Sequence, residues 1–267
     1  MVMIVSRLYF FDIDGTLIDC PAGMNEMSKR TIDSLNRLKE NGDYVFLSTG
    51  RCKCFIVDEV MWYPFDGYVT CNGGYVEFKN KEVYKSVIDG EIIKKTHDLC
   101  KKHNWLYYFE SNDYIYVLDK EDDRNDLMIN HWKMKKETII DEYDYNEIET
   151  YVGMIVINNL NEVKIVEKEI GPYFDVQKHQ HGLSFDLTPK NESKGKGIIE
   201  LVKYLDLSIE DTIAFGDGNN DIEMLQTAGI GIAMGNAVEN AKKAANYITK
   251  SVLEDGISEA LQELKLL

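Results

Sequence analysis

The chain contains 267 residues, of which 44% are hydrophobic and 28% are charged, and its formal net charge is -16 at pH 7. This composition is typical of folded globular domains and excludes a disordered or low-complexity chain. The negative charge also argues against nucleic acid or an anionic membrane as a partner, because both require a basic surface.

The N-terminal part predicts a strand, a helix and two further strands. Short apolar runs at residues 7–14, 43–50 and 66–74 end in polar residues or glycine, as buried strands do. Between the first two runs, Ser28 can cap a helix whose apolar residues share one face, and Gly42 can end it. This order is typical of a parallel strand–helix–strand unit.

The C-terminal part repeats this pattern. Apolar runs at residues 211–217, 229–234 and 247–249 alternate with amphipathic helical stretches. Near-continuous apolar strands that alternate with helices indicate a parallel sheet covered on both faces. The sequence therefore predicts an α/β fold with a Rossmann-like parallel-sheet core.

The middle of the chain has a different pattern. Several runs rich in aromatic and β-branched residues lie between Lys81 and Thr188, with helical stretches such as residues 89–104 among them. This mixture predicts an antiparallel or mixed α+β domain. We therefore expect residues 1–81 and 189–267 to form one core domain, and residues 82–188 to form an inserted α+β domain.

Polar residues collect where the predicted parallel strands end. Asp12 and Asp14 follow the first strand, Thr49 and Gly50 end the second, and Asp217 ends the run at 211–217. In an open parallel sheet, ligands bind outside the carboxyl ends of the strands, so these groups would meet at one edge. Aspartates are hard oxygen ligands that suit Mg²⁺, and a metal ion would make their proximity tolerable.

The same edge offers donors for a phosphoryl group. The Thr49 hydroxyl and the Gly50 amide can donate to an oxyanion, and the helix after "GDGNND" adds positive potential at its N-terminus. Lys194, with Ser193 as the cap of its helix, supplies the local positive charge that an acidic protein needs for an anionic ligand. The pattern predicts a phosphoryl-binding site.

The turn after the first strand explains the spacing of its acids. A separation of two residues places Asp12 and Asp14 on one side of an extended chain, and Gly15 allows the backbone to turn sharply. Thr16 either stabilises this turn through a side-chain hydrogen bond or has only a surface role. Asp19 lies beyond the turn, and we assign it no function.

These strings together resemble the signature of the haloacid dehalogenase-like superfamily. "DIDGT" (12–16), "STGR" (48–51), the lysine of "SKGKG" (193–197) and "GDGNND" (216–221) are similar to its four motifs, in order. "CNGG", "AMGNA" and "EDGI" are similar to strings of its Cof-type subfamily, class IIB. The resemblance implies a magnesium-dependent phosphatase whose inserted domain is a cap that covers the site and selects the substrate.

The resemblance also implies the chemical roles of three aspartates. Asp12 would attack phosphorus and form an aspartyl-phosphate, while Asp14 would protonate the leaving oxygen and later take a proton from water. Mg²⁺ would be held by the Asp12 carboxylate, the backbone carbonyl of Asp14, and Asp217.

Further residues are implied to hold the substrate. Thr49, Lys194 and Asn220 would bind the transferring phosphoryl group, and positioning and charge stabilisation do most of the work in such transfers. Asp221 would orient Lys194 or a metal-bound water. Arg51 would either contact the substrate or pair with an acid.

The predicted function is therefore hydrolysis of small phosphorylated metabolites, with sugar phosphates expected on the resemblance alone. A phosphomutase or phosphotransferase would share the core, but it would need a second phosphate-binding cluster in the insert, where basic residues are dispersed. A non-catalytic sensor of phosphorylated metabolites would be marked by the loss of Asp14, which is present.

Other patterns are assigned structural roles. "DGNND" lacks the glycine and glutamate of a calcium loop, and "GIGIAMG" lacks the spacing of a dinucleotide fingerprint. The aromatic residues of "WLYYFE" (105–110) are expected in the core rather than against substrate. For "HQH" (179–181) a solvated loop is favoured over contact with the active site. The histidines of the insert are His97, His103, His131, His179 and His181.

The five cysteines predict a reducing compartment, because their number is odd and the chain is large enough to fold without disulfides. Cys52 and Cys54 lack a matching Cys/His pair for zinc, so we expect ordinary thiols. No signal peptide or membrane-spanning stretch is recognised. We expect a cytoplasmic protein that is a monomer rather than an obligate oligomer.

Overall fold

The computed structural model describes residues 6–126, 129, 135–179 and 182–267. The chain divides into two compact units, and each is described by itself. Unit 1 comprises Met1–Gly50, Val57–Tyr84 and Ser193–Leu267, and unit 2 comprises Arg51–Ile56 and Lys85–Glu192.

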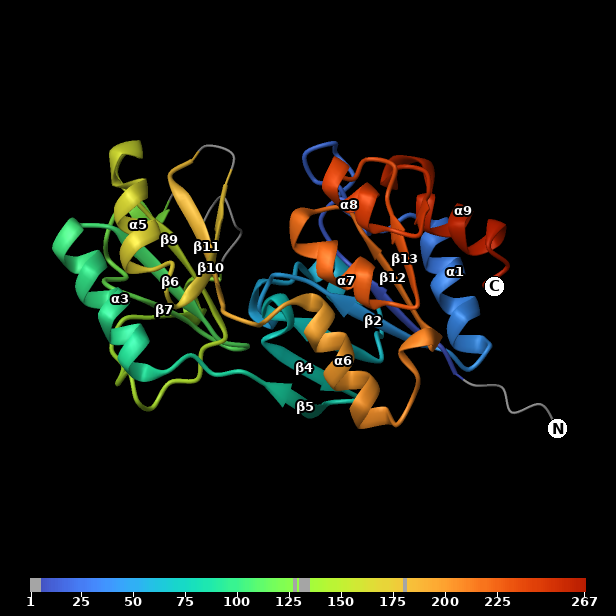
Figure 1. The fold of residues 1–267 in the computed structure, drawn as a ribbon, viewed down its shortest axis with the longest axis horizontal. Coiled ribbons are helices and arrows are strands. Elements are labelled where there is room, and N and C mark those ends of the chain that lie inside the picture. The colour runs from blue at the N-terminus through green and yellow to red at the C-terminus, as the bar shows by residue number, and fades with distance from the viewer. Residues whose placement is uncertain (1–5, 127–128, 130–134, 180–181) are drawn as a thin grey trace. The chain divides into compact units, whose positions relative to one another are not determined.

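Unit 1 is built on an eight-stranded sheet in the order β14–β13–β12–β1–β2–β3–β4–β5 (Figure 1). The strands from β14 to β3 are parallel, and β4 pairs antiparallel with β3. The parallel-sheet core predicted from the sequence is confirmed. The strands are β1 (Leu8–Phe11), β2 (Tyr44–Ser48), β3 (Gly67–Thr70), β4 (Tyr75–Phe78), β5 (Lys81–Lys85), β12 (Thr212–Gly216), β13 (Ile230–Ala233) and β14 (Tyr247–Ile248).

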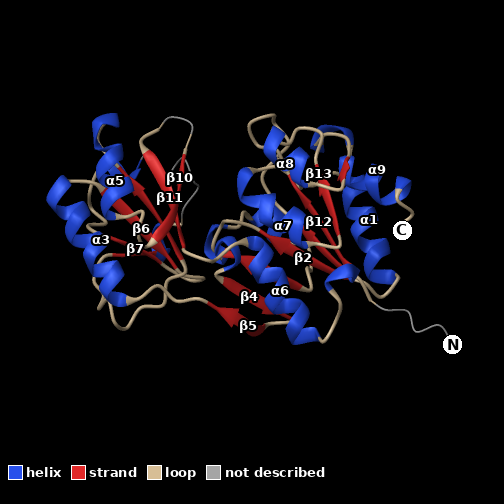
Figure 2. Ribbon diagram, in the orientation of Figure 1, coloured by secondary structure: helices blue, strands red, loops and turns tan. Residues whose placement is uncertain are grey.

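Helices cover both faces of this sheet (Figure 2). In β1, Leu8 and Phe10 belong to a core cluster that also contains residues of α6 and α7. The alternate residue Tyr9 points the other way and donates a hydrogen bond to the backbone carbonyl of Leu266, after α9. A strand buried on both faces reads as a continuous apolar run. The helices are α1 (Lys29–Glu40), α2 (Asp58–Met61), α6 (Lys194–Leu205), α7 (Ile222–Thr227), α8 (Glu239–Ala244) and α9 (Gly256–Glu263).

The predicted helix caps of unit 1 are confirmed. The Ser28 hydroxyl accepts a hydrogen bond from the backbone N–H of Thr31 at the start of α1, and the Ser193 hydroxyl accepts one from Lys196 at the start of α6. These bonds satisfy N–H groups that the first turn of a helix leaves without a partner. The cap on α6 fixes the place of Lys194, the first residue of that helix.

Unit 2 is a six-stranded sheet in the order β10–β11–β9–β6–β7–β8. Its strand pairs are antiparallel except β7 with β8. The elements are α3 (Gly90–His103), β6 (Leu106–Glu110), β7 (Ile115–Val117), β8 (Ile139–Ile140), β9 (Val152–Val156), α5 (Val163–Glu169), β10 (Phe174–Lys178) and β11 (Ser184–Pro189).

The two faces of the unit 2 sheet pack differently. Tyr107 and Phe109 of β6 lie in a core cluster with residues of α3 and α5, whereas Leu106 and Tyr108 lie in a cluster against which Cys54 and Phe55 pack. The expectation that the aromatic residues of "WLYYFE" belong to the core is confirmed.

The boundaries of the units differ from those predicted. Unit 1 continues to Tyr84 rather than residue 81, and it resumes at Ser193 rather than residue 189. The reason at the first boundary is a hairpin: Lys79 and Asn80 both have positive φ, 47° and 61°, so β5 folds back beside β4 in the core sheet. The segment Arg51–Ile56, predicted as core, belongs to unit 2 because Cys54 and Phe55 pack on its sheet.

Candidate active site

The centre of the site is a buried ion-pair triad in unit 1. Lys194 Nζ lies 2.6 Å from Asp12 Oδ1 and 2.6 Å from Asp221 Oδ1. The Lys194 and Asp221 side chains are fully buried, and the Asp12 side chain is 9% exposed. Asp12 directly follows β1 and its backbone N–H bonds the Phe215 carbonyl of β12, so the triad forms at the carboxyl ends of adjacent parallel strands.

Asp217 and Asp221 are held by the turn after β12. Asp221 Oδ2 accepts hydrogen bonds from the backbone N–H groups of Asp217, at 2.9 Å, and Gly218, at 2.8 Å. The Thr16 hydroxyl donates to Asp217 Oδ1 at 3.2 Å. Both oxygens of Asp221 therefore have partners, one in Lys194 and the other in two backbone amides. In Asp217, Oδ1 accepts from Thr16 and Oδ2 remains available for a ligand.

The charges of this cluster do not balance without a cation. Asp12, Asp217 and Asp221 lie around one buried lysine, and their ligand oxygens are all within 4.8 Å of one another. Burial, and next the charge of Asp221, raises the pKa of Asp12 well above its ordinary value and raises the pKa of Asp217 to about 7. Burial alone would lower the pKa of Lys194, but Asp12 and Asp221 outweigh it and raise that pKa.

The donor set fits a hard divalent cation. Asp12 Oδ1 bonds Lys194 and Asp217 Oδ1 accepts from Thr16, so each keeps its second oxygen for a ligand. Carboxylate oxygens at this spacing suit Mg²⁺, and a divalent ion would neutralise the two negative charges that Lys194 leaves uncompensated. Asp221 contributes its two oxygens to Lys194 and the backbone instead.

The glycine after the two acids is required by both conformation and space. Gly15 has φ of +86°, and a Cβ there would lie 2.2 Å from Asp217 Oδ2. The Gly15 carbonyl accepts a hydrogen bond from the Asn236 side chain at 2.8 Å. Asp14, just before the turn, is exposed, while Asp12 is buried. One acid is thus fixed in the cluster and the other can meet a ligand from solvent.

The predicted phosphate-binding strand end also comes to this edge of unit 1. Thr49 is buried, and its backbone carbonyl accepts from the Asn72 N–H at 3.1 Å. The Asn220 side chain donates to Asn72 Oδ1 at 3.3 Å. A Cβ on Gly50 would lie 2.9 Å from Asn72 Oδ1 and 3.2 Å from Asn220 Nδ2, so only glycine allows this close approach.

Arg51 acts on an acid, one of the two arrangements considered for it, because its charge opposes the rise in the pKa of Glu110. Its Nη1 donates to the backbone carbonyl of Phe55 at 3.0 Å, within the segment Arg51–Ile56 of unit 2. The guanidinium therefore closes the turn that follows Gly50.

Three contributors were not assigned from the sequence. Thr16 was left between two roles and is found bonded to Asp217, while Asn72 and Asn236 were given none. Both asparagines lie in strings quoted for the family resemblance, "CNGG" and "AMGNA". These strings were the only sequence signal for the two asparagines. At Asn72 the residue type also fits the backbone, because asparagine tolerates the positive φ of 50° found there.

Several side assignments can now be settled. Asp19 accepts a hydrogen bond from the Ala22 N–H, a turn role. His179 lies in the loop directly after β10 and is partly exposed; it bonds the Ser184 hydroxyl and lies 2.9 Å from Asp186. His131 and His181 lie outside the described residues. None of the five cysteines, all of which are among the described residues, forms a disulfide.

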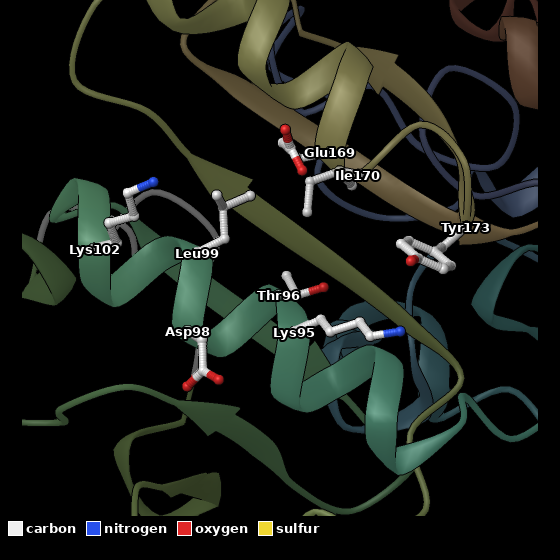
Figure 3. Close-up of a pocket in the computed structure, with 8 residues that line it drawn as sticks. All are labelled: Lys95, Thr96, Asp98, Leu99, Lys102, Glu169, Ile170 and Tyr173. Atoms are coloured by element: carbon white, nitrogen blue, oxygen red, sulfur yellow. The ribbon is translucent and has the colours of Figure 1, made fainter.

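A hollow of about 320 Å³ in unit 2 contains none of the predicted site residues (Figure 3). It lies between α3 and the end of α5, and Lys95 there stacks over the Tyr173 ring. Its lining residues are Lys95, Thr96, Asp98, Leu99, Lys102, Glu169, Ile170 and Tyr173.

Comparison with known proteins assigns the family. A family model described as haloacid dehalogenase-like hydrolase matches residues 9–261. The phosphatase candidate YkrA of Bacillus subtilis is 32% identical over 98% of this chain and 99% of its own. The phosphoglycolate phosphatase of Archaeoglobus fulgidus is 29% identical over 96% of each chain. The solved structure of the HAD subclass IIB sugar phosphatase BT4131 has a TM-score of 0.83 and 30% identity, over 98% of this chain and 100% of that one.

The chain belongs to the haloacid dehalogenase-like hydrolases and, within them, to the Cof-type subfamily. It is a phosphatase. In the part of the chain that the structure describes, no helix has the length and hydropathy needed to cross a membrane.

Proposed function

We propose that the protein is a magnesium-dependent phosphohydrolase that removes phosphate from small metabolites through an aspartyl-phosphate at Asp12. The observation that carries this proposal is the position of Asp12, buried at the end of β1 and 2.6 Å from Lys194. A carboxylate held against a lysine and beside two further acids is placed for nucleophilic attack on an anionic phosphoryl group.

The proposal gives a role to each polar side chain at this edge of the unit 1 sheet. Asp12 attacks phosphorus in line, Lys194 stabilises the negative charge of the phosphoryl oxygens, and Thr49 and Asn220 orient that group. Asp221 fixes the Lys194 ammonium through its ion pair. When bound at Asp12 and Asp217, with the Asp14 carbonyl, Mg²⁺ supplies positive charge against the phosphoryl oxygens.

Asp14 is the proposed acid and base. Its exposure allows contact with the leaving oxygen of a substrate, which it protonates in the first displacement. In the second displacement it takes a proton from the water that attacks the aspartyl-phosphate. The Gly15 turn and the Asn236 bond hold Asp14 at the edge where Asp12 reacts.

We propose sugar phosphates or similar monoesters as substrates and the cytoplasm as the compartment. Support for the first comes from the 30% identical sugar phosphatase and for the second from the five free cysteines. Unit 2 is the proposed specificity domain, since it is inserted into the catalytic core of unit 1.

Hydrolysis of an aryl phosphate tests the proposal. Asp12→Asn is expected to lower kcat by at least about 10³-fold, because an amide cannot act as the nucleophile. Asp19→Asn is the matched control, since Asn keeps the oxygen that accepts from Ala22. Chelation should stop turnover of the unmodified protein and Mg²⁺ should restore it. Turnover that persists in Asp12→Asn would refute the nucleophile, and activity with a panel of sugar phosphates would identify the substrate class.

A further inference from the structure

Two cysteines beside the predicted phosphate-binding strand end have no part in the site described above. Cys52 and Cys54 lie in the segment Arg51–Ile56 of unit 2, and their sulfur atoms are 3.2 Å apart. This is closer than the ordinary contact of about 3.5–4.0 Å between two non-bonded carbon atoms, although sulfur is larger. A disulfide of about 2.05 Å would require the sulfurs to approach by only about 1 Å.

The two thiols have different surroundings. Cys52 is fully buried, and its thiol forms a hydrogen bond with the Glu110 carboxyl. Cys54 is partly exposed, and its thiol donates to the backbone carbonyl of Ser111 at 3.7 Å. An oxidant in solution reaches the exposed sulfur first, and a second thiol in contact with it is placed to complete a disulfide.

We propose that Cys52 and Cys54 form a reversible disulfide in the presence of peroxide, and that this bond lowers phosphatase turnover. The Cys54 sulfur attacks one peroxide oxygen, the O–O bond breaks, and a sulfenic acid and water form. The Cys52 sulfur then attacks the Cys54 sulfur and displaces hydroxide, which leaves as a second water after taking the Cys52 proton through Glu110. Two thiols lose two electrons in total, and one hydrogen peroxide is reduced to two waters.

The expected loss of turnover follows from the hydrogen bonds within the segment Arg51–Ile56. The Phe55 N–H donates to the Cys52 carbonyl at 2.9 Å, and Arg51 Nη1 donates to the Phe55 carbonyl, so the segment is a closed turn. A disulfide draws the Cys52 sulfur from Glu110 and tightens that turn. Only Arg51 separates Cys52 from Gly50, so a shift of the turn moves the backbone donors of the phosphate-binding strand end.

Peroxide treatment of the full chain loaded with Mg²⁺ tests the inference with two readouts. Peptide mapping by mass spectrometry should find Cys52 and Cys54 joined, with a mass lower by two hydrogen atoms. Aryl phosphate hydrolysis should fall several-fold and return with dithiothreitol. The second readout rests on the phosphatase activity, whereas the first does not.

Three serine variants make the test specific. C52S and C54S should keep the activity of the untreated protein and resist peroxide, because serine retains a hydroxyl donor at each place. C20S removes another partly exposed thiol and should remain as sensitive as the unmodified protein.

Three results would overturn the inference: no bond between residues 52 and 54, a bond without loss of activity, or an equal loss in C54S. If the untreated protein hydrolyses no monoester, the proposed function fails, and the mass readout still decides whether the disulfide forms.

Discussion

The two sheets of this protein differ in where they can gather polar groups. In unit 1 the parallel strands β12, β1 and β2 end at the same edge, so Asp217, Asp12 and Thr49 meet there from distant parts of the sequence. In unit 2 the antiparallel neighbours end at opposite edges, and one of its buried acids, Glu110, meets Cys52 at the end of β6. A parallel sheet therefore assembles a catalytic cluster more readily than an antiparallel one.

The buried acids of the two units are also compensated differently. Asp221 has a lysine and two backbone N–H groups as partners. Burial, followed by the charge of Asp186, raises the pKa of Glu110 to about 8, while a hydrogen bond from the Cys52 thiol and the charge of Arg51 oppose this rise. The charged partner of the unit 1 acids Asp12 and Asp221 is a buried lysine, whereas Glu110 in unit 2 has a thiol donor and stays protonated near neutral pH. The four predictions below test this contrast.

The largest expected effect is the removal of the buried cation. Lys194→Met leaves Asp12 and Asp221 without their shared partner, which should lower the free energy of unfolding by about 3–5 kcal/mol and abolish turnover. Urea unfolding measures the first effect. Lys203→Met, on the exposed side of the same helix, is the control. A loss below about 1 kcal/mol would show that the lysine does not hold the cluster together.

The next largest effect is expected at the turn that follows the two acids Asp12 and Asp14. Gly15→Ala adds a Cβ 2.2 Å from Asp217 Oδ2 at a residue with φ of +86°, and should cost about 2–3 kcal/mol of stability and lower Mg²⁺ affinity. Gly23→Ala is a matched control, because Gly23 also has φ of +86° but has open space around it. Thermal unfolding of both variants separates the clash from the backbone strain, and equal losses would argue against the clash.

The pH dependence of the metal-free protein tests the charge excess of unit 1. The folded-state pKa of Asp217, about 7, lies above its unfolded value, so stability is greatest at low pH and falls as pH rises through this window. Between pH 5 and pH 7 the loss should be about 2 kcal/mol. Denaturant unfolding should show a weaker dependence in Asp217→Asn and in protein saturated with Mg²⁺. An unchanged slope in both would contradict the assignment.

A smaller effect is expected in unit 2 within the narrow window from pH 7 to pH 8. The folded-state pKa of Glu110 is also raised, so its contribution to stability is lost as pH rises, by about 1 kcal/mol between pH 7 and pH 8. Glu110→Gln should remove this loss, while Glu121→Gln, at an exposed side chain, should retain it. If the two variants had the same pH profile in denaturant unfolding, Glu110 would not be the titrating group.

The elements of unit 1 could be predicted because their signals are local. The run before Asp12 is apolar at every position since β1 is buried on both faces, and Ser28 and Ser193 cap helices a few residues away. All of β5 after its first residue was assigned to the insert, because Lys79 and Asn80 are not a strong turn signal and only pairing with β4 reveals the strand as part of the core.

The sequence by itself determined which acids and threonine stand at strand ends and which lysine begins a helix, because these follow from short patterns and their order. Only the tertiary structure decided how they share charge: that Lys194 bridges Asp12 and Asp221, and that Thr16 occupies one oxygen of Asp217. It also brought Asn72 to Asn220, and Cys52 to Glu110. Such contacts depend on distances between residues far apart in the chain, which no local pattern of residue types encodes.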